Sequence, residues 1–119
     1  VELGASLETK VPENGYTALF VAQDMNDIKM MKHLRYLGAD INARDKIGRT
    51  ILHVVSVYTD SKEDKEISQM IASWDGLDIH VRDISGCTAL GLAKKNNNKK
   101  MVKYLQNLSF SRVKKALNG

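Results

Sequence analysis

Residues 38–53 read GADINARDKIGRTILH and join two short motifs that recur along this chain. The second motif is a glycine followed two residues later by threonine and then by two apolar residues. It begins at Gly15, Gly48 and Gly86, in steps of 33 and 38 residues. The first motif, at 38–42, has counterparts at 4–6 and 76–80, each ten or eleven residues before the second. Two motifs that recur in the same phase predict a repeat architecture.

Each repeat has the pattern of two helices. The threonine of the second motif follows a turn glycine and opens an apolar stretch, which suits an N-cap hydroxyl that accepts from a free amide. The predicted N-caps are Thr17, Thr50 and Thr88. Later in each repeat apolar residues recur at spacings of three and four, as in Ile28, Met31 and Leu34, which predicts one buried helix face. Polar clusters at 26–27, 61–64 and 96–98 predict the turns between paired helices, and Gly4, Gly38 and Gly76 the ends of the second helices.

Together the two motifs resemble the ankyrin repeat, whose units recur with a period of about 33 residues. The resemblance implies an all-α fold, an ankyrin-repeat solenoid of stacked helix-turn-helix units with hairpin-like connectors and a C-terminal capping helix. The match is best at residues 50–53. Elsewhere the chain departs from the family pattern, with Ala18, Ile51 and Ala89 in place of proline and with Phe20 and Gly91 in place of histidine.

The repeat spacing divides the chain into five segments. We expect the tail of a preceding repeat at 1–13, repeats at 14–45, 46–83 and 84–108, and a capping helix at 109–119. The middle repeat holds about five extra residues, which we place at 61–66, between its helices. Because the first residues resemble the end of a unit, we expect further repeats before them.

The last segment, 109–119, has the pattern of an amphipathic helix. Phe110, Val113 and Leu117 follow one another at spacings of three and four, with basic residues between them. Because the ends of a stack of repeats need covering, we expect this helix to cover the last repeat. A helix that binds a partner or a membrane is the alternative.

Composition favours a soluble globular protein. The chain has 119 residues, of which 43% are hydrophobic and 27% charged. Charged residues interrupt every apolar run, so we expect no membrane-spanning helix and no membrane partner. The one cysteine, Cys87, cannot form an internal disulfide, which favours a reducing, intracellular location in the cytoplasm or the nucleus.

The sequence contains none of the motifs typical of catalysis, such as His-Glu-x-x-His, Cys-x-x-Cys, a phosphate-binding loop or Gly-x-Ser-x-Gly. We interpret Cys87 as a variable tip residue. The resemblance implies that His53 ties its helix to the neighbouring repeat, and that His80, which aligns with Asn42, also joins repeats. Histidines scattered in this way argue against a zinc site. We therefore expect no enzymatic activity, no metal and no cofactor.

The resemblance implies a non-catalytic module that binds another protein. In ankyrin repeats, partners contact the connector tips and the exposed inner helices, and stacked units offer an extended concave surface for this. In this sequence those positions are Glu13, Asn14, Tyr16, Asp24, Met25, Lys46, Ile47, Arg49, Val57, Tyr58, Ile84, Ser85, Cys87, Lys95 and Asn96. The oligomeric state stays open.

Charge leaves two further functions open. Residues 94–119 contain eight Lys and Arg and no Asp or Glu, whereas the rest of the chain is acidic, with a net charge of −4. A basic end can bind nucleic acid or an acidic surface. We consider nucleic acid the weaker interpretation, because Tyr104 and Phe110 fit the apolar helix pattern rather than a stacking platform. A regulatory ankyrin segment within a larger enzyme is the other alternative.

Overall fold

The computed structural model describes residues 7–57 and 62–118, and within these residues every regular element is a helix. The helices are α2 (Ala18–Asp24), α3 (Ile28–Tyr36), α4 (Ile51–Val57), α5 (Lys62–Ala72), α6 (Ala89–Lys95) and α7 (Lys99–Asn118). The prediction of an all-α fold is therefore confirmed.

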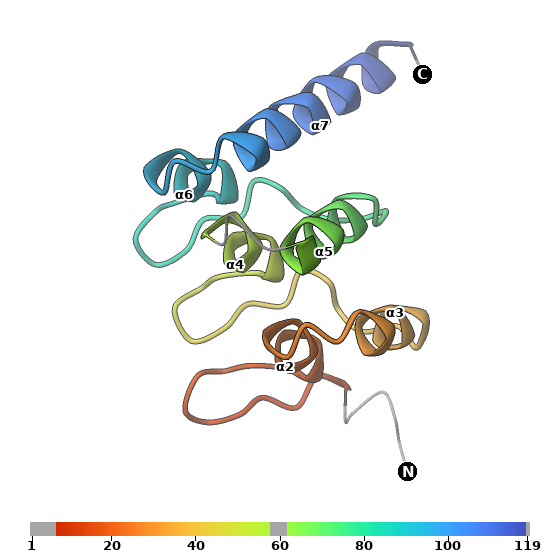
Figure 1. The fold of residues 1–119 in the computed structure, drawn as a ribbon, viewed down its shortest axis with the longest axis vertical. Helices are drawn as coiled ribbons and strands as arrows, with labels where there is room; N and C mark the ends of the chain where they lie inside the picture. The colour runs from red at the N-terminus through yellow and green to blue at the C-terminus, as the bar shows by residue number, and fades with distance from the viewer. Residues whose placement is uncertain (1–6, 58–61, 119) are drawn as a thin grey trace.

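The helices form a stack of pairs (Figure 1). Helices α2, α4 and α6 lie one above another in the middle, the extended connectors lie on one side of them, and α3, α5 and α7 lie on the other side. The core follows the stack, with Leu19, Phe20 and Met31 buried in the first pair and Leu52 and Ile71 in the second. The stack extends 42 Å along its longest axis. This is the predicted solenoid.

The threonine N-caps differ from one repeat to the next. The hydroxyl of Thr88 accepts from the amide of Gly91 at 3.1 Å, and that of Thr50 lies 2.9 Å from Nδ1 of His53. Thr17 stands at the N-cap of α2, but its buried hydroxyl has no hydrogen-bond partner. Phe20 stands three positions after Thr17, where the middle repeat has His53, so no ring nitrogen is present beside this hydroxyl.

The turns at 26–27 and 96–98 lie between paired helices as predicted, but the predicted turn at 61–64 is wrong for residues 62–64, which already belong to α5. Asn26 and Asn97, each with φ of 55°, separate the paired helices. Asp27 then caps α3 by accepting from Met30. Gly38 has a φ of 97° just past α3, as predicted for a helix end, and Gly76 has 85°. Gly4 lies outside the described residues.

The additional residues of the middle repeat are not confined to 61–66. Helix α5 has 11 residues where α3 has nine. Residues 73–75 then precede Gly76, whereas only Leu37 precedes Gly38. This longer segment after α5 contains Trp74, whose ring lies 5.8 Å from the guanidinium of Arg35. Arg35 also donates to the carbonyl of Asp75 at 2.9 Å. The additional residues thus form a contact with α3.

The second helix of the last repeat and the predicted capping segment form one continuous helix, α7, of 20 residues. Its first half packs against α6 through Met101 and Leu105. Our expectation that Phe110, Val113 and Leu117 cover the last repeat is wrong, because these side chains are 70%, 56% and 82% exposed. Phe110 follows Leu108 by two residues, or about 200° around the helix, and Val113 and Leu117 share the side of Phe110. They therefore face away from the packed side.

Side-chain hydrogen bonds of His53 and Asn42 join neighbouring repeats. The ring Nε2 of His53 lies 2.9 Å from the carbonyl oxygen of Cys87, as the resemblance implied. Asn42 donates to the carbonyl of Gly76 at 2.8 Å and accepts from the amide of Asp78 at 2.7 Å. The ring of His80 is exposed, and no bond from it to another repeat is found among the described residues, so the expected joining role is not seen there. The bonds make the repeats one stacked body.

Candidate functional site

The connectors that lead into α4 and α6, which we call the second and third connectors, are shaped by a half-buried and a buried aspartate. The Oδ1 of Asp45 accepts from the amides of Ile47 and Arg49, at 3.0 and 2.9 Å. The Oδ1 of Asp83 accepts in the same way from Ser85 and Cys87, both at 2.9 Å. Each aspartate therefore stabilises a tight turn, and the side chains at the tip of that turn point outward.

Backbone bonds tie the connectors into one row. The amide of Ile84 donates to the carbonyl of Ile47 at 3.0 Å, and the amide of Lys46 donates to that of Asn14 at 2.9 Å. Gly48 permits this approach. It has a φ of 76°, and a Cβ there would lie 3.1 Å from the amide nitrogen of Ile84. The tips form a continuous and well-supported surface.

An ion pair adds an electrostatic link between the second and third connectors. Arg49 Nε lies 3.5 Å from Oδ2 of Asp83, whose side chain is 3% exposed. Burial raises the pKa of Asp83, but the amides of Cys87 and Ser85, the His53 ring and the Arg49 guanidinium outweigh burial and lower that pKa below its ordinary value. Asp83 is therefore held as a carboxylate.

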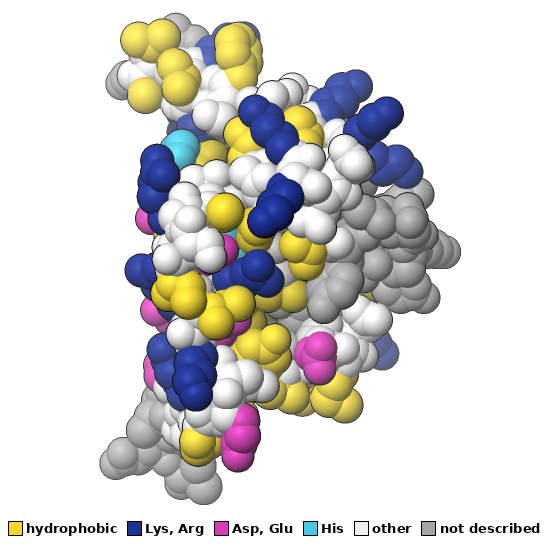
Figure 2. Space-filling model, turned by 90° about the vertical axis from the view of Figure 1, so that its left-hand side faces the viewer, with side chains coloured by type: hydrophobic (Ala, Val, Ile, Leu, Met, Phe, Trp, Pro, Cys, Tyr) yellow, Lys and Arg dark blue, Asp and Glu magenta, His cyan; other side chains and the backbone are white. Residues whose placement is uncertain are grey.

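Most of the predicted binding residues lie exposed along this row and on the adjacent ends of the short helices. The exposed ones are Glu13, Asn14, Asp24, Met25, Lys46, Ile47, Ile84, Ser85, Lys95 and Asn96. Met25 and Ile84 are the most open apolar members, at 71% and 73% exposure. We call this set the connector surface. Figure 2 shows it from the connector side, with hydrophobic and charged side chains interleaved from bottom to top.

Four predicted residues are half-buried and have structural partners or neighbours instead. Tyr16 stacks on Phe20 with ring centroids 5.0 Å apart, and Arg49 pairs with Asp83. Cys87 provides its carbonyl to His53, and Val57 ends α4. Tyr58 lies outside the described residues.

One exposed apolar residue beside the connector surface was not predicted from the sequence. Val21 lies one turn before Met25 on α2 and is exposed like it. The four-residue spacing of Val21 and Met25 was the available indication, because residues four apart share a helix face.

The described residues show no grouping of three or more His, Cys, Asp or Glu side chains that could hold a metal ion. Over the same part of the chain, no helix combines the length and apolar character that a membrane crossing needs.

Comparison with known proteins agrees with the fold. Residues 14–46 match the family model of the ankyrin repeat. The chain is 34% identical over 83 residues to an ankyrin repeat protein of Acanthamoeba polyphaga mimivirus, covering 70% of this chain and 11% of that protein. It is 34% identical over 82 residues to an I-kappa-B like protein of Microplitis demolitor bracovirus, covering 66% of this chain and 43% of that protein.

A vertebrate relative has a similar identity. The chain is 35% identical over 79 residues to NF-kappa-B inhibitor delta of Mus musculus, covering 66% of this chain and 23% of that protein. The chain thus spans less than half the length of each of these relatives.

Proposed function

We propose that this chain, a member of the ankyrin-repeat family, is a non-catalytic module that binds another protein through the connector surface. The observation that carries the proposal is the row of tips itself. Backbone bonds join the tips from one repeat to the next, while their side chains, such as Lys46, Ile47 and Ile84, are left free in solvent. A preorganised surface loses little conformational entropy on binding.

The chemistry of the connector surface suits a protein partner. It mixes exposed apolar side chains with charged ones, as protein interfaces do. The charges also change along the stack, from Glu13 and Asp24 at the α2 end to Lys46 and then Lys95 at the α6 end. A partner with the opposite order of charges would be bound in one orientation.

The relatives support an inhibitory or regulatory role. One is named as an inhibitor of NF-kappa-B and another as an I-kappa-B like protein. We extend to this chain only the class of function, which is control of another protein by binding it. We place the chain inside the cell because its one cysteine cannot form an internal disulfide.

Affinity capture from a cell lysate, followed by mass spectrometry, tests the proposal. The parent chain is compared with a variant that carries Lys46→Ala, Ile47→Ala and Ile84→Ala. These side chains are exposed, so the variant should keep the parent's circular dichroism and thermal unfolding. Arg49 is left in place because its loss would disturb Asp83.

A matched control carries Lys29→Ala, Lys32→Ala and Tyr36→Ala on α3. These side chains are also exposed, but they lie on the second helix of the pair, away from the connectors. We expect at least one protein to be captured by the parent and by the control and lost by the connector variant. Equal capture by all three would show that the connector surface is not the binding site.

A further inference from the structure

The C-terminal end of the stack carries a second surface, separate from the connector surface. Phe110, Val113 and Leu117 are exposed along one side of α7, at spacings of three and four residues. In Figure 2 hydrophobic side chains gather at the top of the molecule, where α7 ends. Three apolar side chains exposed in line form a patch rather than the scattered exposure common on protein surfaces.

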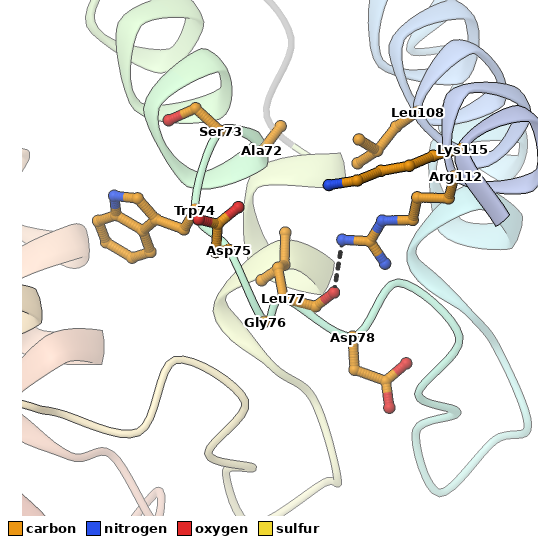
Figure 3. Close-up of a pocket in the computed structure, with 10 residues that line it drawn as sticks. All are labelled: Ala72, Ser73, Trp74, Asp75, Gly76, Leu77, Asp78, Leu108, Arg112 and Lys115. Carbon is orange, nitrogen blue, oxygen red and sulfur yellow. Dashed lines mark hydrogen bonds between the residues drawn. The ribbon is translucent and has the colours of Figure 1, made fainter. Parts of the chain in front are cut away.

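The opposite side of α7 holds this patch in place. Arg112 donates from Nη2 to the carbonyl of Leu77 at 2.6 Å. Figure 3 shows Arg112, Lys115 and Leu108 directed from α7 towards residues 75–78, across a hollow of about 550 Å³. The second half of α7 is therefore anchored to the middle repeat, and its apolar side is presented outward.

Lysines continue the side of α7 that carries Phe110 towards α6. Lys99, Lys103 and Gln106 precede Phe110 at three- and four-residue spacings, so all of them share one face of the helix. With Lys94 of α6 they border a hollow of about 280 Å³. We call this face, from Lys94 to Leu117, the end surface. It is basic at one end and apolar at the other.

The segment that carries these lysines has no acidic residue of its own, because residues 94–119 contain eight Lys and Arg and no Asp or Glu. Figure 2 shows several Lys and Arg side chains in the upper part of the molecule. A ligand that covers this surface must therefore be acidic where it meets the lysines and apolar where it meets Phe110.

We propose that the end surface binds an acidic amphipathic helix of a partner protein. Such a helix, laid along α7, would place its apolar stripe on Phe110, Val113 and Leu117 and its carboxylates over Lys94, Lys99 and Lys103. A nucleic acid would satisfy the lysines but leave the apolar line in water. A membrane surface is a poorer match, because interfacial helices bury a broad apolar face and this one is a single line.

Fluorescence anisotropy with designed peptides tests the proposal on the intact chain. The probe is a labelled peptide of the same length as α7, with Leu at three- and four-residue spacings and Glu at most other positions. Two matched peptides replace every Glu by Lys or every Leu by Ser. We expect only the Glu/Leu peptide to bind, and its affinity to fall as salt is added.

Four variants locate the binding. Phe110→Ser with Leu117→Ser removes the ends of the apolar line, and Lys94→Glu with Lys103→Glu reverses the basic part. These side chains are exposed, so both variants should fold as the parent does. Each should weaken binding of the Glu/Leu peptide by about tenfold or more, because a few interface side chains carry most of the binding energy. Tyr36→Ser and Lys29→Glu with Lys32→Glu, on α3, are the controls and should change nothing.

The outcomes separate this proposal from the alternatives and from the connector surface. The connector variant should bind the Glu/Leu peptide as the parent does, so failure of one proposal leaves the other standing. Equal binding of all three peptides, or binding that the end-surface variants do not weaken, would overturn the proposal. So would selective binding of phosphatidylserine vesicles or of an RNA duplex with no affinity for the Glu/Leu peptide.

Discussion

His53 shows how much of this fold depends on single side chains. Its Nδ1 accepts from the amide of Thr50 at 3.1 Å, which leaves the proton on Nε2 to be donated to the carbonyl of Cys87. One ring therefore bonds both to the start of α4 and to the next repeat. Phe20 and Gly91, at the equivalent positions, provide neither bond.

The two threonines Thr50 and Thr17 should respond differently to the same substitution. Thr50→Val removes the hydroxyl that bonds to His53, and we expect the free energy of unfolding to fall by about 1 kcal/mol. Thr17→Val removes a buried hydroxyl with no partner, so stability should stay the same or rise. Urea unfolding followed by circular dichroism measures both. Equal losses would contradict the role assigned to His53.

Asp83 should make stability depend on pH in the acidic range. Because its pKa is lower in the folded chain, its stabilisation is complete above the ordinary Asp value of about 3.9 and is lost as the pH falls through the folded-state value. Asp83→Asn keeps an acceptor for the connector amides but loses the attraction to Arg49. We expect about 1–2 kcal/mol less stability at neutral pH, and a difference from the parent that narrows below pH about 4.

Asp45→Asn is the matched control for Asp83→Asn. Asp45 accepts from two connector amides in the same way, but no ion pair with it is found among the described residues. We expect a smaller loss at neutral pH. If urea unfolding shows the same loss and the same pH profile for both variants, the ion pair with Arg49 is not the cause.

At the scale of the element, the stability of α6 is lowered by a glycine inside the helix. Gly91 lies inside this seven-residue helix and is exposed. A Cβ added there would meet its nearest atom, the Thr88 hydroxyl oxygen, at 3.5 Å, which is an ordinary contact. Gly91→Ala should therefore raise the free energy of unfolding by about 0.5–1 kcal/mol, because glycine loses more backbone freedom on folding. Unchanged or lower stability in thermal unfolding would contradict this.

At the scale of the whole molecule, stability is a sum over repeats and the interfaces between them. Asn42 is a test of one interface, because its amide makes both of its bonds to the next repeat. In the parent, circular dichroism of all helices and fluorescence of Trp74 should follow one urea transition. In Asn42→Ala we expect these two transitions to separate as the repeats uncouple.

Thr50→Val is the control for that measurement. It weakens one repeat while leaving the bonds of Asn42 intact, so both transitions should move together to lower urea. Coincident transitions in Asn42→Ala would mean that apolar packing alone couples the repeats.

The sequence by itself determined the architecture of this protein. The spacing of Gly15, Gly48 and Gly86, the cap at Thr50 and the apolar stripe of α3 are local features, and local backbone rules are enough to interpret them. The ankyrin resemblance then gave the positions of the connector tips, and the exposed ones include Lys46 and Ile47. The boundaries between repeats stay predictions.

Only the tertiary structure decided which side chains remain free. The sequence predicted that Arg49 binds a partner. In the structure its guanidinium instead pairs with Asp83, far along the chain. On α7, Met101 and Leu105 are buried and Arg112 bonds to the distant carbonyl of Leu77, whereas Phe110 lies exposed to water. Contacts between residues distant in sequence depend on how the repeats stack, and a local pattern does not encode that stacking.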